Sequence, residues 1–360
     1  MSKHIDCLEG FSLQKLPLAK DLAMYYFSAC GNSKEALDSH LGIIDSISGM
    51  RIAGPEIYAS FETNSHFGLS AGGFNFLGTQ LGIEAYRGLQ CCLIPKSISR
   101  DIIFKGKKVG VYFEDDFASY ALLGGICPDD KTADAYSQTT QVFENIEGAL
   151  AEVKMDFSNI ARTWFYNDKI LDWYGDFNRA RDSFFNSRKV FEGIVPASTG
   201  IGSGNCLNSA LVARAFAFKT KGEVLNLREV ESPMQCSAMD YKSSFSRAVE
   251  LEHPLFKHLI VSGTAGIEYG GKTAFVGDLK RQINLALDVI EAILKSRGMA
   301  WENSLRAVAY LKDFSFFKDF EEIKKMRGLD ALPCVAIQAD VCRDDLLFEM
   351  ELDAAIVKHF

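Results

Sequence analysis

The sequence predicts an α+β fold with two related lobes. The first observation is a repeat: residues 142–166 align with residues 286–310 without a gap, at an offset of 144. Seven of the 25 aligned positions are identical, and one of them pairs Arg162 with Arg306. The second observation is a shared order of patterns, because in both copies helical spacing gives way to strand-like alternation and then to a second helix. A long-period repeat of this kind indicates two copies of one folding unit.

The elements of each copy follow from local patterns. A probable strand that ends in glycine precedes the first helix, whose apolar residues recur every three or four positions. An alternating strand comes next, then a second helix, and then strands whose entry is marked by proline. The expected elements, earlier copy before later copy, are strands at 120–125 and 258–263, second helices at 170–185 and 314–326, and proline-marked segments at 195–202 and 332–339.

The remaining segments define the expected domains. The glycine-rich and aromatic run after Gly68 resembles strands with turns, and we assign residues 1–119 to an elaboration of the earlier lobe. The polar segment 219–233 is the expected connection between the lobes. The sequence therefore predicts an elaborated N-terminal lobe at 1–220 and a C-terminal lobe at 232–360.

Composition excludes several classes of function. The chain has 360 residues, a formal net charge of −8 and an isoelectric point of about 5.4. This charge argues against nucleic-acid binding and against docking on an anionic membrane. The sequence has neither a secretory signal pattern nor a run of about 18 apolar residues that would cross a membrane. Nine cysteines without a Cys-x-x-Cys motif or a Cys/His cluster indicate a reduced, cytoplasmic protein without a metal site.

Glu349 is the strongest catalytic candidate. It lies in an alternating segment at 346–352, where Leu347, Glu349 and Glu351 should share one face of a strand. Burial and the second carboxylate would both favour the neutral form of Glu349, and a raised pKa would make it a general acid near neutral pH. The alternative is a glutamate on an edge strand that faces water.

An arginine and two tyrosines are candidates for substrate binding. Arg162 begins a strand and has Trp164 and Tyr166 on its face, so it could offer a planar fork to a carboxylate. The alternative is a structural ion pair, which we favour for its repeat partner Arg306. Tyr166 and Tyr241 could donate to a substrate oxygen, although a tyrosine buried in the core is the commoner explanation.

The later half, from Ser232 to about Lys358, resembles the YjgF/RidA family. The chain taken whole resembles the chorismatases, a family built on the same fold. The motifs that carry these resemblances are ARTWFYND at 161–168, WYGDFNRARDSFF at 173–185, VPASTGIG at 195–202, SSFSRA at 243–248, SGTAG at 262–266 and ADVCRDDLLFEMEL at 339–352.

The resemblance implies two YjgF/RidA-like lobes, each a mixed sheet backed by two helices. It also implies an enzyme that removes pyruvate from chorismate without a cofactor, giving 3-hydroxybenzoate or a dihydroxycyclohexadiene carboxylate. Glu349 matches the catalytic glutamate, and a cysteine such as Cys342 accompanies 3-hydroxybenzoate formation. Arg247 and Gly263 lie in segments that border the family's site. The resemblance leaves a monomer and a homotrimer open.

A second function remains open in the YjgF/RidA resemblance, namely small-metabolite binding or imine deamination. Deaminase members place an arginine after the proline that opens the penultimate strand, where it holds the substrate carboxylate. Here Pro333 is followed by Cys334. That departure argues against deamination.

Overall fold

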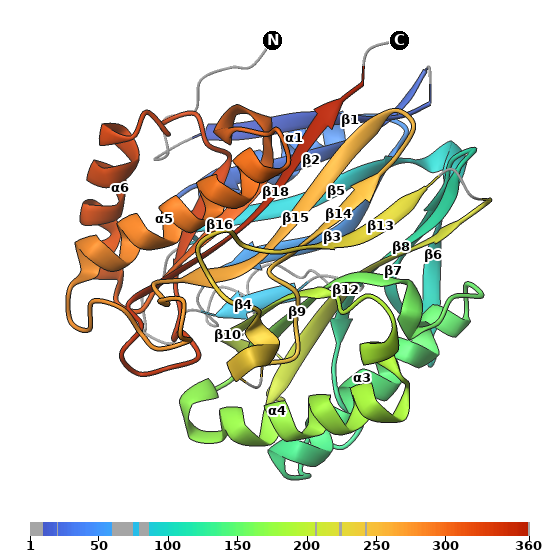
Figure 1. Cartoon of the computed structure of the whole chain (residues 1–360). Coiled ribbons are helices and arrows are strands. Elements are labelled where there is room, and N and C mark those ends of the chain that lie inside the picture. Colours follow the sequence, from blue (N-terminus) through green and yellow to red (C-terminus); the bar gives the residue numbers. More distant parts are fainter. Residues whose placement is uncertain are drawn as a thin grey trace.

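The computed structural model describes residues 10–19, 21–59, 75–78, 86–205, 207–222, 225–241 and 243–358. The run after Gly68 lies outside the described residues, except for 75–78, which form a strand. The side chain of Tyr241 also lies outside the described part of the structure. Three six-stranded sheets make up the interior. Figure 1 shows helices α5 and α6 on one side of these sheets and helices α3 and α4 on another.

The earlier lobe contains the second sheet, sheet B, in the strand order β10-β9-β12-β8-β7-β6. Strands β9 and β10 are parallel, and the other neighbours are antiparallel. Its elements are β6 (Ser99–Phe104), β7 (Lys107–Glu114), β8 (Ala118–Ile126), α3 (Ala135–Ala151), β9 (Ile160–Asn167), α4 (Ile170–Ser187), β10 (Ala197–Gly202) and β12 (Leu211–Thr220).

The later lobe contains the third sheet, sheet C, in the order β13-β14-β15-β18-β16-β17. Residues 226–230, which we expected in the connection between lobes, form its edge strand β13. Its elements are β13 (Asn226–Val230), β14 (Ala248–Glu252), β15 (Phe256–Ala265), α5 (Leu279–Ser296), β16 (Ser304–Leu311), α6 (Phe317–Met326), β17 (Cys334–Gln338) and β18 (Phe348–Val357).

The repeat predicted from the sequence is confirmed. Helix α5 begins 144 residues after helix α3, and strand β16 begins and ends 144 residues after strand β9. The repeated asparagines have the same task, because the side chain of Asn159 accepts from the backbone N–H of Asp156 and Asn303 accepts from that of Ala300. The two-lobe α+β fold is therefore present, with helices backing each mixed sheet.

The described residues between Gly10 and Pro95, together with the short strand at Gly204–Asn205, form a third unit, sheet A, that the sequence did not reveal. Its order is β1-β2-β5-β3-β4-β11, which matches β14-β15-β18-β16-β17 of sheet C for the first five strands. As in the other two sheets, one neighbouring pair, β3 and β4, is parallel. The elements are β1 (Gly10–Ala19), β2 (Leu22–Cys30), α1 (Lys34–Ser46), β3 (Met50–Tyr58), β4 (Asn75–Gly78), β5 (Gly88–Pro95) and β11 (Gly204–Asn205).

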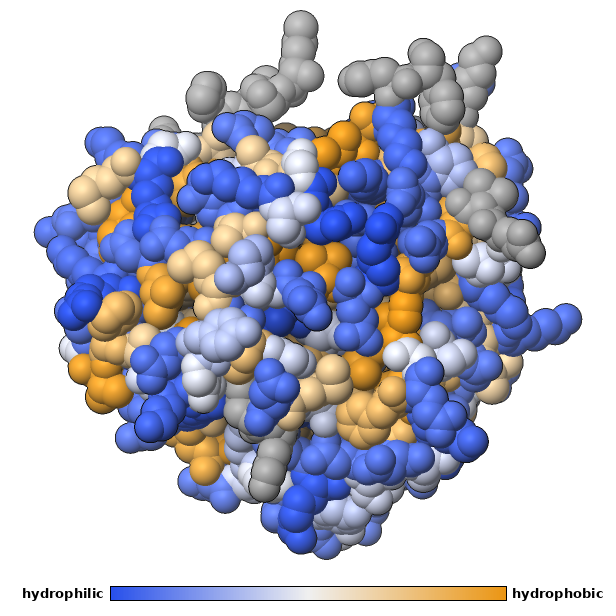
Figure 2. All heavy atoms as spheres, in the orientation of Figure 1, coloured by the Kyte–Doolittle hydropathy of each residue, from blue (hydrophilic) through white to orange (hydrophobic). Residues whose placement is uncertain are grey.

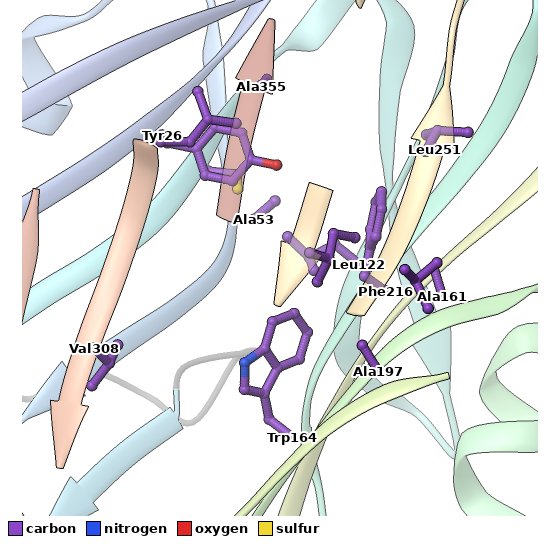
Figure 3. Packing of buried hydrophobic residues seen from close by; sticks show 14 of the residues in the cluster. Tyr26, Ala53, Leu122, Ala161, Trp164, Ala197, Phe216, Leu251, Val308 and Ala355 are labelled. Atoms are coloured by element: carbon purple, nitrogen blue, oxygen red, sulfur yellow. The ribbon is translucent and has the colours of Figure 1, made fainter. Parts of the chain in front are cut away.

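The apolar core has an inner part and three outer parts. Each outer cluster lies between one sheet and its own helices. The inner cluster takes residues from all three sheets, for example Tyr26, Trp164 and Val308 (Figure 3). The three sheets therefore pack face to face around one interior, and the helices cover their outer faces.

The outer surface is mixed in character. Figure 2 shows hydrophilic residues over most of the face in view, with apolar residues in smaller areas between them. None of the described helices has the length and apolar character needed to cross a membrane.

Buried ion pairs join the three sheets at the centre of the inner core. Glu56 of sheet A forms ion pairs with Arg214 of sheet B and Arg306 of sheet C. Glu351 of sheet C forms ion pairs with Arg162 of sheet B at 2.9 Å and with Arg306 at 2.8 Å. Removing one member of such a network leaves an uncompensated charge in the interior, which destabilises a fold strongly.

Three members of this network occupy equivalent places in the three sheets. Glu56, Arg162 and Arg306 are each the first paired residue after a register shift, in β3, β9 and β16 respectively. The related lobes thus bring equivalent positions together at one point.

We expect Glu56→Gln to lower the free energy of unfolding by about 3–5 kcal/mol, because Arg214 and Arg306 lose a buried counter-charge. Urea unfolding followed by circular dichroism measures this change. The matched control is Asp344→Asn, which breaks an ion pair with Lys312 at an exposed carboxylate and should change stability little. Equal effects of the two substitutions would contradict a structural role for the central network.

Candidate active site

A pocket lies between the earlier and later lobes, with an empty volume of about 560 Å³ that includes space open to solvent. It is lined by helix α4, strand β10, the segment before β14, the end of β15, the segment before β18, and the start of β18 itself. The lining residues are Tyr174, Arg181, Ser198, Gly200, Ser243, Phe245, Arg247, Gly263, Ala265, Ile267, Cys342, Arg343 and Glu349.

Glu349 reaches this pocket from the centre of a sheet. Strand β18 lies between β15 and β16, so the edge-strand alternative does not describe its surroundings. Alternation along β18 turns Phe348 and Met350 toward the apolar cluster under helix α5, and it turns Glu349 to the other face. The side chain of Glu349 is only 6% exposed.

The surroundings of Glu349 favour its protonated form. Burial raises its pKa to about 8, and the negative charge of Glu351 acts in the same direction. The positive charges of Arg162 and Arg247 oppose this rise without cancelling it. Glu349 forms no ion pair with any residue in the described part of the chain.

Glu351 behaves in the opposite way although it is equally buried. Burial alone would raise the pKa of Glu351, but Arg306 and Arg162 outweigh burial and lower that pKa below its usual range. Trp164 also donates to Glu351, with its indole nitrogen 2.9 Å from Oε1. The two carboxyl groups on one strand face are therefore in different protonation states at neutral pH.

Gly263 makes room for the acid. A Cβ atom at this position would lie 1.9 Å from Oε1 of Glu349, so any side chain here would displace the carboxyl group. Gly263 lies in a register shift of β15 between Val261 and Thr264, where the strand bends away from regular pairing with β18. Its backbone N–H donates to the Thr199 hydroxyl at 3.0 Å. The glycine in the SGTAG motif thus leaves the carboxyl group of Glu349 in its place in the pocket.

Three arginines line the pocket, and each donates to a neutral acceptor. Arg181 donates to the side-chain oxygen of Asn178 at 2.7 Å, Arg247 to the carbonyl of Cys236 at 3.0 Å and Arg343 to the carbonyl of Gly271 at 2.8 Å. Burial lowers the pKa of Arg181. The pocket therefore combines several positive charges with one neutral acid.

Sequence reasoning missed Arg181, although a signal was present. Arg181 lies four residues after Phe177 and three before Phe184, so it belongs to the apolar face of helix α4. An arginine on the buried face of an amphipathic helix needs a partner or a ligand. Arg343 and Tyr174, which also line the pocket, offered no comparable pattern.

Cys342 lies beside Glu349 in the pocket and keeps its proton. Burial raises the pKa of its thiol to about 12, with Glu349 as the next largest cause. The thiol is therefore a neutral, weakly polar wall of the pocket and not a thiolate nucleophile.

The structure divides the residues selected from the sequence into two groups. Glu349, Cys342, Arg247 and Gly263 meet at the pocket. Arg162 and Tyr166 lie instead in the central network.

The contacts of Arg162 and Tyr166 explain that placement. Arg162 is fully buried and pairs with Glu351, which corresponds to the ion-pair alternative. The Tyr166 hydroxyl donates to Glu56. Tyr241 ends a short helical turn at Ala238–Tyr241, and the structure describes only its backbone.

The arrangement suits acid catalysis on a small anion. A protonated carboxylic acid faces a confined space with positive walls, so it can deliver a proton to a bound, negatively charged molecule. Among the described residues, no group of three or more His, Cys, Asp or Glu side chains is arranged to hold a metal ion.

Comparisons with known proteins agree with the resemblance inferred from the sequence. The family described as endoribonuclease L-PSP matches residues 236–356. A 3-hydroxybenzoate synthase from Streptomyces hygroscopicus is 27% identical over 277 residues, which cover 68% of this chain and 76% of the relative. A chorismatase from Streptomyces rapamycinicus is 28% identical over 225 residues, which cover 55% of this chain and 64% of the relative. The chain resembles the chorismatases.

The fold agrees as well. A crystal structure of a chorismatase superposes on this chain with a TM-score of 0.67 at 19% sequence identity. The superposition covers 92% of this chain and 98% of the chorismatase chain. The shared fold extends over the first sheet, for which the sequence offered no motif.

We expect Glu349 to make stability depend on pH. Its carboxyl ionises near its ordinary value of 4.5 in the unfolded chain and near 8 in the folded protein. Between these values the folded state binds more protons, so the free energy of unfolding should fall as the pH rises, by about 1.4 kcal/mol per pH unit from this residue.

Urea unfolding from pH 5 to 9 tests this contribution. Glu349→Gln should gain stability relative to the wild type as the pH rises through this range, because the amide never ionises. Glu268→Gln, at an exposed position, is the control and should follow the wild-type curve. A constant difference between Glu349→Gln and wild type would show that Glu349 is ionised throughout.

Proposed function

We propose that the chain is an enzyme of the chorismatase type that releases pyruvate from chorismate. The observation that carries the proposal is a neutral glutamic acid, Glu349, in a pocket with three arginines. Chorismate has two carboxylates and an acid-sensitive vinyl ether, so it needs both positive charge and a proton donor. The relatives named 3-hydroxybenzoate synthase and chorismatase support the same assignment.

In the proposed reaction Glu349 protonates the methylene carbon of the enolpyruvyl group. If water captures the resulting oxocarbenium ion, it returns a proton to Glu349, and the bond between the side-chain carbon and the ether oxygen breaks to give pyruvate and the dihydroxycyclohexadiene carboxylate. If a ring hydroxyl captures the ion, it returns that proton to Glu349. The bond from this hydroxyl oxygen to the ring and the bond from the ether oxygen to the side-chain carbon then break, and loss of a ring proton gives 3-hydroxybenzoate and pyruvate. A carboxyl group with a pKa of about 8 keeps its proton at neutral pH, so it is ready to act as the acid.

The arginines would hold the two carboxylates of the substrate. We assign this role to Arg181, Arg247 and Arg343, because they line the pocket, whereas Arg162 is already paired with Glu351. Guanidinium groups suit this task, since they donate paired hydrogen bonds to a carboxylate.

Cys342 supports 3-hydroxybenzoate as the product. Formation of 3-hydroxybenzoate and pyruvate from chorismate consumes no net water, whereas the dihydroxycyclohexadiene carboxylate needs one water molecule. A neutral thiol next to Glu349 is a poor site for an ordered water, so it favours capture by a ring hydroxyl.

Incubation with chorismate and an assay for pyruvate test the proposal directly. We expect Glu349→Gln to lower pyruvate release by about 100- to 10,000-fold, which is the usual contribution of a general acid. The amide keeps the shape of the side chain, so folding should survive. Near-native turnover by this variant would place the acid elsewhere, and no pyruvate from the wild type would overturn the function.

Glu351→Gln should act through Glu349. Loss of the neighbouring negative charge removes one cause of the raised pKa. Activity of the wild type should fall above about pH 8 as Glu349 ionises, and in Glu351→Gln this fall should begin at lower pH. A pH profile of kcat/KM, which reports on the free enzyme, measures the shift. A uniform loss of activity at all pH values would instead indicate damage to the fold alone.

Arg181→Gln should weaken substrate binding. We expect KM for chorismate to rise by about tenfold or more, since hydrogen bonds to charged groups contribute about 1.5–3 kcal/mol. The control is Arg188→Gln. Arg188 caps the end of the same helix and pairs with Glu147 at the surface, so its substitution should leave KM unchanged. An unchanged KM in Arg181→Gln would assign the carboxylates to the other arginines.

A further inference from the structure

A second cleft in the molecule is built from elements that are equivalent to those of the candidate active site. It lies between sheet A and sheet C, and its empty volume is about 690 Å³. Strand β17 and helix α6 line it, as β10 and α4 line the first pocket. The end of β2 and Arg87, which directly precedes β5, complete it. The lining residues are Cys30, Gly31, Asn32, Arg87, Phe314, Phe317, Glu321, Cys334 and Ala336.

Strand pairing shows that the two clefts are equivalent. In the first cleft Ser198 pairs with Thr163, and in the second cleft Cys334 pairs with Ala307. Thr163 and Ala307 are 144 residues apart, which is the offset of the repeat. The same relation connects Gly200 of the first cleft with Ala336 of the second.

The close approach of a glycine is also repeated, with a different partner. A Cβ at Gly263 would collide with Glu349, and a Cβ at Gly31 would lie 2.9 Å from the ring of Tyr86. Tyr86 does not line the cleft but packs in the outer cluster beneath helix α1, where its hydroxyl is 2.9 Å from Nδ1 of His40. The carboxyl group among the described lining residues of the second cleft is that of Glu321, and it pairs with Lys324.

Arg87 supplies positive charge to the second cleft. Its guanidinium lies over the ring of Phe314, 4.0 Å from the centroid, and burial lowers its pKa. No carboxylate in the described part of the chain forms an ion pair with Arg87. Glu321, which lines the same cleft, pairs with Lys324. Stacking uses the face of a guanidinium and leaves the N–H groups at its edge available for an anion.

We propose that this second cleft binds a small carboxylate with a planar apolar body, without converting it. Arg87 would hold the carboxylate, and Phe314, Phe317 and Ala336 would contact the apolar part. A single arginine suits one carboxylate, whereas the three arginines of the first cleft suit two. This site is independent of the reaction proposed above.

Benzoate is a suitable probe, titrated into the full-length protein by calorimetry. The measurements use the Arg181→Gln background, which weakens anion binding in the first cleft. We expect Arg87→Gln to weaken benzoate binding by about tenfold or more. Ala336→Ile, which fills the cleft and keeps the charge, should weaken it as well. Arg100→Gln is the matched control, because Arg100 stacks on Tyr112 at an exposed position outside both clefts.

Two results would overturn the proposal. One is the absence of benzoate binding at millimolar concentration, and the other is equal affinity in the Arg87→Gln, Ala336→Ile and Arg100→Gln proteins. Pyruvate release from chorismate should be unchanged in Arg87→Gln. The binding result holds whether or not the chain acts on chorismate, so failure of one proposal is distinguishable from failure of the other.

Discussion

The ion pairs of Glu351 determine the chemistry of the neighbouring acid. Two carboxylates on one strand face repel each other, and the interior cannot solvate both charges. Arg162 and Arg306 pair with Glu351, so Glu351 is the one that ionises. Glu349 remains buried with a raised pKa and keeps its proton. The same contacts connect sheets B and C, so the fold and the protonation state of the acid depend on one set of charges.

The relation among the three sheets explains how this charge set is possible. Equivalent positions in three identical subunits would carry identical residues, and three arginines or three glutamates meeting in an interior would repel one another. In this chain the equivalent positions hold Glu56, Arg162 and Arg306, so attraction replaces repulsion. Related lobes within one sequence can diverge, and divergence also allows one cleft to hold Glu349 while another holds Arg87.

The sequence predicted the parts of the fold that rest on local pattern. The offset of 144 located helices α3 and α5 and strands β9 and β16, because hydrophobic spacing and the asparagine caps are local features. It did not reveal sheet A, whose likeness to sheet C lies in strand order and not in residues. Glu349 was predictable from alternation along its strand. The pairing of Arg162 with Glu351, 189 residues apart, follows only from how the sheets pack.

The positions of the pocket arginines resolve an apparent conflict. Positive charges near a carboxyl group favour its ionised form, which would remove the proton that the proposed reaction needs. Arg181, Arg247 and Arg343 each donate to a neutral oxygen, and these hydrogen bonds orient them at the pocket. A bound dianion would then neutralise their charge. With that charge offset, Glu349 would feel burial and Glu351 more strongly, so substrate binding itself would hold the proton on Glu349 until transfer.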